Sequence, residues 1–258
     1  MKLGLTDDKI AIEGYLNVLR QAVSNGINKV VLTGSYASTI DPSLKQAFDG
    51  SVTTEKDWGN VTEEELLEST DPMYAYVGAK TLAERAAWKF AQAHPSLDLS
   101  IIAPPFIFGP LADGFPAPKQ AAALSSNRHI YTLLKRSLPP VLPPGFVDVR
   151  DVARAHVLAL NVPKAAVNVE DKRFIVSGGI LVWKDAVEYL HKKRPELKAR
   201  LPAVDGAFPP FPGTPSTIDV TRAKDVLGVQ KYYSWPETLE NTVDSLLDAE
   251  KIWDAVKA

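Results

Sequence analysis

Residues 8–35, DKIAIEGYLNVLRQAVSNGINKVVLTGS, contain the two patterns that decide the fold of this chain. Apolar residues recur at helical spacing over residues 8–26, and Gly26 stands where a helix is expected to be capped. The segment that follows, NKVVLTGS, is a run of β-branched and apolar residues that is typical of a buried parallel strand. A helix followed at once by a buried strand predicts the first unit of an α/β fold.

The same alternation continues along the chain. A segment rich in alanine and glutamate predicts a helix that contains Tyr76 and ends near Ala93, and LDLSIIAPPFIFGP at 97–110 predicts a second buried strand whose apolar run stops at prolines. GFVDVRDVARAHVLAL at 145–160 predicts a short strand that leads into a helix, and KRFIVSGG at 172–179 predicts a third buried strand. Strands that alternate with helices predict a parallel sheet.

The remaining segments predict a smaller, mostly helical lobe. The section around residues 110–145 is rich in proline and is expected to be irregular, and GAFPPFPGTPST at 206–217 is typical of an ordered loop or lid. Helices are expected at 182–193 and 236–256, with a short turn at 221–227.

The composition is that of an ordinary globular protein, and it argues against several functions. The 258 residues are 45% hydrophobic and 23% charged, with a formal net charge of -2, so neither nucleic acid nor a membrane is an expected partner. Cysteine is absent, which excludes disulfides and thiolate ligands, and no metal site is expected. The chain shows no signal-peptide pattern and no apolar run of membrane-spanning length, so a cytoplasmic location is expected.

Tyr76 and Lys80 in YAYVGAK are the first candidate for chemistry. A residue and its neighbour four positions later share one face of a helix, so their polar tips can reach the same ligand. A lysine cation close to a phenol favours the phenolate and prepares it for acid/base work. The spacing alone is weak support, because Tyr131 with Lys135 and Tyr189 with Lys193 repeat it.

The surrounding sequence separates the three pairs. Tyr189 lies on an apolar helical stripe and Tyr131 has no serine-bearing strand before it, so both are interpreted as packing residues. Tyr76 instead follows the strand that ends at Ser35, at the edge where a parallel sheet presents its ligand site. The next strand ends with PPFIFGP at that same edge, so the three segments are expected to converge.

Several ordered motifs carry a family resemblance. VVLTGSYAS, YAYVGAK, AERAAWKF, PPFIFGP and FVDVRDVARAH, with TEKDW and STIDVTRAKDVLG, resemble the extended short-chain dehydrogenases/reductases of the NAD-dependent epimerase/dehydratase superfamily. The nearest patterns are those of the fungal aldehyde/ketone (methylglyoxal-type) reductases and the plant dihydroflavonol and cinnamoyl-CoA reductases. The resemblance implies a Rossmann-type doubly wound parallel sheet. It also implies a cofactor domain with the catalytic residues in 1–112 and 146–180, and a substrate-binding lobe in 113–145 and 181–258.

The resemblance also implies a role for each matching position. Tyr76 is expected to protonate a carbonyl oxygen as hydride arrives, and Ser35 to hydrogen-bond that oxygen. Lys80 is expected to hold the nicotinamide ribose of NADP together with Tyr76. Ile107 matches a position beside the nicotinamide amide, and Ser126 matches a contact to a cofactor phosphate.

Two features depart from the family pattern. Gly34 stands where many relatives carry a second serine, next to the position of the catalytic one. In addition, the fifteen glycines include no G-x-x-G-x-x-G loop, so the resemblance implies that the first strands and the adenosine site are absent. We therefore expect weak or no cofactor binding and an unpaired edge at residues 30–32 that could support self-association.

Three functional interpretations remain open, and whether this chain itself catalyses a reaction is open with them. The first is an NADP(H)-dependent reductase of small aldehydes or ketones in N-terminally truncated form. The second is a catalytically inactive short paralogue that acts as an interaction protein. The third is a hydroxysteroid dehydrogenase or epimerase of the same superfamily. Four phenylalanines suggest an apolar pocket for a carbonyl substrate with an organic tail, namely Phe106, Phe108, Phe208 and Phe211.

Overall fold

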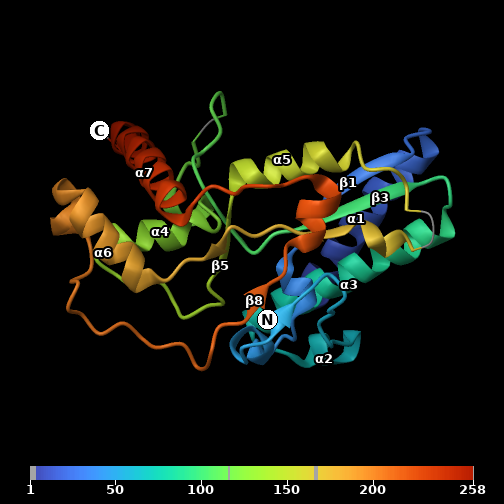
Figure 1. The fold of residues 1–258 in the computed structure, drawn as a ribbon, viewed down its shortest axis with the longest axis horizontal. Helices are drawn as coiled ribbons and strands as arrows, with labels where there is room; N and C mark the ends of the chain where they lie inside the picture. Colours follow the sequence, from blue (N-terminus) through green and yellow to red (C-terminus); the bar gives the residue numbers. More distant parts are fainter. Residues whose placement is uncertain (1–3, 116, 166–167, 258) are drawn as a thin grey trace. The chain divides into compact units, whose positions relative to one another are not determined.

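The computed structural model describes residues 4–115, 117–165 and 168–257, which form two compact units (Figure 1). Unit 1 comprises Met1–Pro105, Val152–Ser177 and Gly213–Gln230, and unit 2 comprises Phe106–Asp151, Gly178–Pro212 and Lys231–Ala258. The described residues contain parallel strands and helices, which agrees with the α/β class expected from the sequence.

A three-stranded parallel sheet forms the centre of unit 1. Its strands are β1 (Lys29–Thr33), β3 (Asp98–Ala103) and β6 (Arg173–Ile175), in the order β1-β3-β6. Every residue of β3 is buried, as expected for the middle strand of a parallel sheet that is covered on both faces.

Helices cover both faces of this sheet. On one face, α1 (Gly4–Ser24) and α3 (Pro72–Ala93) pack against each other. Apolar residues from both helices and from β1 and β3 form their shared core, which includes Leu19, Trp88 and Ile101. On the other face lies α5 (Val149–Ala159), whose His156 ring shares a hydrogen bond of 2.8 Å with the Thr33 hydroxyl of β1. The Lys29 ammonium of β1 donates to the carbonyl of Leu160, just beyond this helix. Alternate residues of β1 therefore face opposite layers.

Short elements complete unit 1. They are η1 (Tyr36–Thr39), η2 (Lys45–Phe48), α2 (Glu63–Glu68), η4 (Val169–Lys172), a turn of π-helix at Ala223–Leu227, and β2 (Val52–Thr53) paired with β8 (Thr217–Ile218). The pairing of β2 with β8 brings residues 213–230 into unit 1, whereas the sequence analysis assigned them to the C-terminal lobe.

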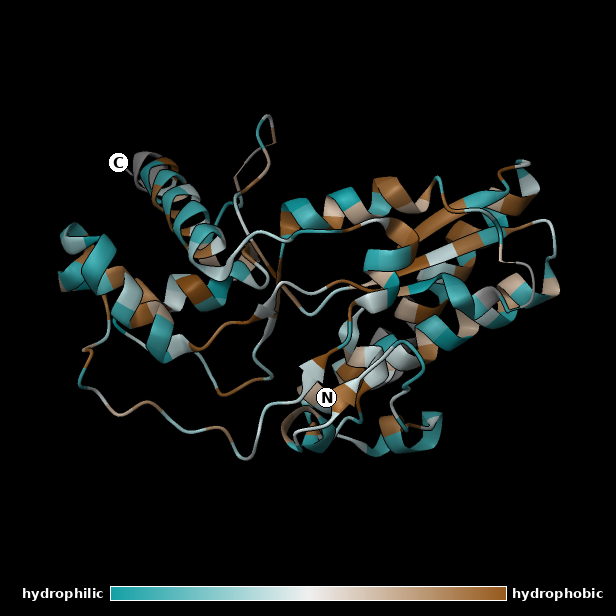
Figure 2. Cartoon of the chain, viewed as in Figure 1, coloured by the Kyte–Doolittle hydropathy of each residue, from teal (hydrophilic) through white to brown (hydrophobic). Residues whose placement is uncertain are grey.

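Unit 2 combines a small mixed sheet with three helices. Strand β4 (Phe106–Phe108) pairs in parallel with β5 (Gly145–Asp148), which pairs antiparallel with β7 (Gly179–Ile180). Strands β4 and β5 lie in unit 2, whereas the sequence analysis assigned β4 and residues 146–148 of β5 to the cofactor domain. Around the sheet lie α4 (Asn127–Leu133), α6 (Trp183–Lys193) and α7 (Trp235–Lys257), with η3 (Ala121–Ala123) and η5 (Pro195–Arg200). Figure 2 shows hydrophobic and hydrophilic residues alternating around these helices, whose apolar sides share one core.

The main departure from the sequence prediction concerns residues 97–110. The single strand predicted there is two strands, because β3 ends at Ala103 and β4 begins at Phe106, in a different sheet and a different unit. Pro104 and Pro105 separate them, and proline has no N–H to continue a ladder. Helix α4 is also an addition, since it lies in the section around residues 110–145 that was expected to be irregular, and α2 lies where the sequence analysis predicted no element.

Candidate active site

Ser35 lies directly after β1, at the edge where the sequence predicts a site. Its backbone is extended, its side-chain oxygen accepts a hydrogen bond of 3.1 Å from the N–H of Ala37, and it caps η1. The side chain is buried, with 8% of Ser35 exposed. The N–H of Tyr36 donates to the carbonyl of Pro104 at 2.9 Å, which ties the segment to the end of β3. Ser35 therefore has a fixed position at the carboxyl edge of the sheet.

Tyr76 and Lys80 lie on the first turns of α3. The helix begins after Asp71, whose carboxylate accepts from the N–H of Met73, and Pro72 occupies its first position. The Lys80 ammonium lies 5.7 Å from the centroid of the Tyr76 ring. Tyr76 is 49% exposed, and none of the described residues forms a hydrogen bond with its hydroxyl. The phenol is therefore available to a ligand.

A buried ionic network fastens the Ser35 segment to α3. The Ser38 hydroxyl donates to Glu84 Oε2 at 2.5 Å, and Arg173 on β6 donates to Glu84 Oε1 at 2.7 Å and to Ser38 at 3.0 Å. All three residues are almost completely buried. Breaking one partner of such a network leaves a buried charge without compensation, so the network holds η1 and α3 in one arrangement. The structure thus brings Ser35, Tyr76 and Lys80 onto two elements that pack together in unit 1.

Tyr15 is a neighbour of this group that the sequence analysis did not identify. Its hydroxyl donates to the carbonyl of Thr33 at 2.5 Å. Burial, followed by the charges of Glu84 and Tyr76, raises the pKa of Tyr15 to about 12. The Tyr15 hydroxyl therefore stays protonated and acts as a fixed donor to the end of β1. The sequence offered one signal by which Tyr15 could have been identified, a tyrosine on the side of the predicted helix that faces the sheet.

The two other tyrosine-lysine pairs lie in unit 2 and have partners within the fold. Tyr131 is 8% exposed, and its hydroxyl donates to Glu250 at 2.7 Å. Tyr189 donates to Glu240 at 2.6 Å and packs against the Trp235 ring. Both hydroxyls are engaged, in contrast to that of Tyr76.

Ile107 and Ser126, the expected cofactor contacts, lie in unit 2. Ile107 is the middle residue of β4 and pairs with Val147. Ser126 is partly buried at the start of α4, and its side chain makes no capping hydrogen bond. The three residues with expected catalytic roles and these two cofactor contacts therefore belong to different units.

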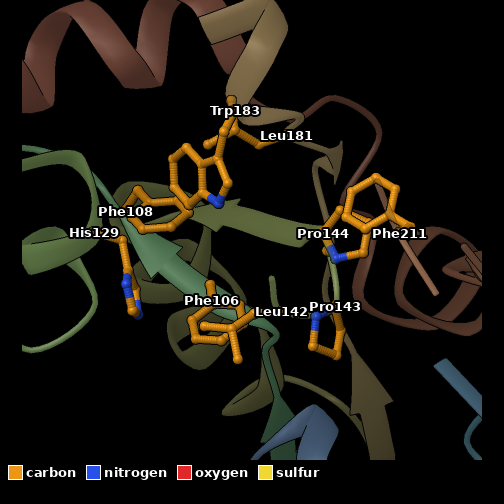
Figure 3. Close-up of a pocket in the computed structure, with 10 residues that line it drawn as sticks. Phe106, Phe108, His129, Leu142, Pro143, Pro144, Leu181, Trp183 and Phe211 are labelled. Carbon is orange, nitrogen blue, oxygen red and sulfur yellow. The ribbon is translucent and has the colours of Figure 1, made fainter. Parts of the chain in front are cut away.

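An aromatic pocket lies within unit 2 (Figure 3). The pocket is small and partly open to solvent. Phe106, Phe108 and Phe211 line it, as the sequence suggested, whereas Phe208 packs against the core of unit 2 instead. Because side chains alternate along a strand, Ile107 points to the face of β4 opposite the two phenylalanines. The sequence analysis missed the other lining residues, which are Leu142, Pro143, Pro144, Gly145, His129, Leu181 and Trp183.

Two kinds of feature are absent from the part of the chain that the structure describes. Within residues 4–115, 117–165 and 168–257, no cluster of three or more acidic or histidine side chains has the arrangement of a metal site. No helix among the same residues combines the length and the apolar character that crossing a membrane requires.

Comparison with known proteins places these residues in context. A model of the NAD dependent epimerase/dehydratase family matches residues 8–171, well over half of the chain. The NADPH-dependent methylglyoxal reductase of Saccharomyces cerevisiae is 29% identical over 248 residues, which cover 93% of this chain and 69% of that relative. A ketoreductase of Aspergillus niger is 34% identical over 208 residues, which cover 76% of this chain and 56% of that relative.

The fold has a counterpart among solved structures. The crystal structure of the yeast methylglyoxal/isovaleraldehyde reductase complexed with NADPH superposes on this chain with a TM-score of 0.77 at 29% identity. The match covers 96% of this chain and 74% of the yeast chain.

Proposed function

This chain belongs to the NAD dependent epimerase/dehydratase family, as the sequence motifs indicated, and from that premise we propose that it carries the catalytic residues of an NADPH-dependent reductase of aldehydes and ketones. Relatives with names of this kind, a methylglyoxal reductase and a ketoreductase, support the reaction class. The observation that carries the proposal is the exposed Tyr76 phenol beside Lys80, on a helix that is fastened to the segment of Ser35.

In the proposed reaction, each residue has one task. Ser35 donates a hydrogen bond to the carbonyl oxygen of the substrate and positions it. Tyr76 donates its phenolic proton to that oxygen as negative charge develops there. The positive charge of the Lys80 ammonium attracts the negative charge that Tyr76 carries after it has given up its proton. A reduced nicotinamide, when bound, supplies the hydride.

The residues of this chain suit one half of that cofactor. Lys80 and Tyr76 offer a cation and a hydroxyl to the nicotinamide ribose, and we assign Ile107 and Ser126 to the nicotinamide amide and a phosphate. The sequence has no glycine-rich loop to hold the pyrophosphate, so the adenosine half has no matching residues. We therefore propose that these 258 residues hold NADPH weakly and, at ordinary cofactor concentrations, reduce carbonyls with it at a negligible rate.

An experiment with a fragment of the cofactor tests whether the chain can catalyse the reaction, independently of how tightly it binds the whole cofactor. Reduced nicotinamide mononucleotide carries the nicotinamide ribose without the adenosine half. We expect millimolar concentrations of it to support slow reduction of methylglyoxal by the purified chain, and NADPH to give little advantage over it. The Tyr76→Phe variant is expected to lose about 10²–10⁴-fold in rate, because general acid catalysis contributes that much.

Tyr74→Phe serves as the matched control, since Tyr74 lies on the same helix two residues earlier. We expect that variant to retain the rate of the parent chain. Equal rates for Tyr76→Phe and Tyr74→Phe would refute the proposed acid, and so would turnover with NADPH that does not depend on Tyr76.

A second candidate function is that of an interaction protein without catalysis. The edge of β1 favours it, because within the described residues β1 pairs with β3 and with no other strand. An unpaired edge is a template for another strand. For the purified chain, this candidate function predicts self-association through the edge of β1.

A further inference from the structure

The polar groups of Ser35 are arranged so that its hydroxyl is left to donate. The backbone carbonyl of Ser35 accepts from the N–H of Ser38 at 3.0 Å, and its side-chain oxygen accepts from the N–H of Ala37. Because that oxygen already accepts a bond, the hydroxyl proton points elsewhere, and no described residue accepts it. The direction of this proton therefore depends on how firmly the backbone around Ser35 is held.

Thr33 ends β1 two residues before Ser35, and its carbonyl faces the open edge of the sheet. The N–H of Gly34 donates to the carbonyl of Ile102 on β3 at 2.7 Å. Successive residues of a strand in a parallel ladder point their backbone groups to opposite sides, so the carbonyl of Thr33 points away from β3. Within the described residues, no strand lies on that side to bond it.

Tyr15 on α1 bonds this carbonyl in place of a strand. Its hydroxyl donates to the carbonyl of Thr33 at 2.5 Å. Burial, followed by the charges of Glu84 and Tyr76, raises the pKa of Tyr15 to about 12, so the donor keeps its proton at neutral pH. The influence of these two charges also places Tyr15 beside the buried ionic network and the proposed acid.

His156 on α5 holds the side chain of Thr33 from the opposite face of the sheet. Its Nδ1 lies 2.8 Å from the carbonyl of Val152, and its Nε2 lies 2.8 Å from the Thr33 hydroxyl. A carbonyl can only accept, so Nδ1 carries the proton of the neutral ring and Nε2 accepts from the Thr33 hydroxyl. Two helices on opposite faces thus fix the carbonyl and the side chain of one residue.

We propose that Tyr15 and His156 are positioning residues, which hold Thr33 between them and thereby set the direction in which the Ser35 hydroxyl donates to the carbonyl oxygen of the substrate. This role rests on the proposed reductase function. All four residues belong to unit 1. Tyr15 and His156 act through Thr33, since the bonds described for their polar groups go to it and to the backbone of α5.

A double-mutant cycle tests whether Tyr15 acts through Ser35. With reduced nicotinamide mononucleotide and methylglyoxal, we expect Tyr15→Phe to lower kcat by about two- to tenfold, as loss of one hydrogen bond implies. In the Ser35→Ala background there is no hydroxyl to direct, so Tyr15→Phe should leave the remaining rate nearly unchanged. A role in general stability would instead lower the rate by the same factor in both backgrounds.

Thr33→Val extends the test to His156, because it removes the hydroxyl that His156 binds and keeps a β-branched side chain in β1. We expect the same dependence on Ser35. Tyr131→Phe is the matched control: it removes a phenol that donates to Glu250 at 2.7 Å in unit 2, far from Thr33 in the chain, and should leave kcat unchanged. Urea unfolding verifies that each variant is folded under the assay conditions.

Amide hydrogen exchange measured by NMR gives a readout that needs no reaction. The N–H of Ala37 is bonded by the Ser35 side chain, and the N–H of Met73 is bonded in the same way by Asp71 at the start of α3. We expect Tyr15→Phe and Thr33→Val to speed exchange at Ala37 by about two- to tenfold, and to leave Met73 unchanged.

Two results would overturn the proposal. They are an equal effect of Tyr15→Phe on kcat with and without the Ser35 hydroxyl, and exchange at Ala37 that responds to neither substitution. Absence of any Tyr76-dependent turnover in the parent chain would count against the reductase function. In that case, exchange at Ala37 alone decides whether Tyr15 and His156 hold the segment of Ser35.

Discussion

Gly34 occupies a position where the backbone of β1 approaches β3 closely. A Cβ atom at this position would lie 2.6 Å from Cγ2 of Ile101 and 3.4 Å from Oε2 of Glu84. Ile101 is fully buried, so its methyl group has little room to move. Steric crowding therefore explains why a glycine, and not the serine of the family pattern, stands next to Ser35.

Adding a methyl group at Gly34 should destabilise the protein. We expect Gly34→Ala to lower the free energy of unfolding by about 1–3 kcal/mol, because overpacking a dense core forces side chains to shift. Gly14→Ala is the same chemical change in the middle of α1, where a Cβ meets nothing within 4 Å. It should raise the stability by about 0.5–1 kcal/mol through helix propensity. Urea unfolding of both variants measures the contrast, and equal effects would contradict the close approach at Gly34.

At the scale of elements, Glu250 connects α7 to two other helical segments. Its Oε1 accepts from Tyr131 on α4 at 2.7 Å, from Lys135 just after α4 at 3.0 Å, and from Arg200 on η5 at 2.7 Å. Burial by itself raises the pKa of Glu250, but the bonds from Arg200, Tyr131 and Lys135 outweigh it and lower the value from 4.5 to about 2. The ionised carboxylate therefore stabilises the packing of unit 2.

This carboxylate should make stability depend on acid pH. The folded pKa lies below the ordinary value, so the stabilisation is complete above about pH 4.5 and is lost as the pH falls toward 2. As the pH falls through this range, we expect the free energy of unfolding of Glu250→Gln to decrease by about 1–3 kcal/mol less than that of the parent chain, after allowing for solvent screening. Urea unfolding at pH 3, 5 and 7 checks it. Asp248→Asn, on the exposed side of α7, should show the same dependence of stability on pH as the parent chain. If Glu250→Gln also showed the parent's pH dependence, Glu250 would not be the group responsible.

At the scale of the whole molecule, the unpaired edge of β1 is a possible site of self-association. Within the described residues this strand has a partner on one side, β3. Beside it, two apolar side chains are exposed, Val157 on α5 at 62% and Leu160 just beyond this helix at 48%. A strand added to β1 would extend the sheet beneath this helix and cover part of that surface.

We therefore expect the chain to self-associate, with a sedimentation coefficient that rises with concentration. Val157→Glu should shift the association to higher concentration, because it places a charge on the flank of α5 without touching the core. Val226→Glu is the matched control, since Val226 is 49% exposed on the π-helical turn of unit 1. A protein that stays monomeric at all concentrations, or one whose association responds equally to both changes, would argue against pairing through β1.

The order of the elements in unit 1 and the family could be predicted from the sequence alone. Helices α1 and α3 and strands β1 and β6 lie where the apolar periodicity predicted them, because that pattern records which face of each segment is buried. The family followed from several motifs in a fixed order, and the match over residues 8–171 confirmed it. The roles of Ser35, Tyr76, Lys80, Ile107 and Ser126 remain predictions, and the Tyr76→Phe experiment addresses the proposed acid among them.

The partners of each side chain were decided by the tertiary structure. The Lys135 ammonium lies 4.7 Å from the centre of the Tyr131 ring, closer than the 5.7 Å between Lys80 and Tyr76, so pair geometry does not separate the two. What separates them is Glu250, which binds the Tyr131 hydroxyl from 119 positions away. Strand β4 likewise pairs with β5, almost forty residues later, and does not continue the sheet of β3. The pocket around Trp183 also joins segments that are distant in the chain. Local periodicity reports that a residue is buried, whereas long-range packing determines what covers it.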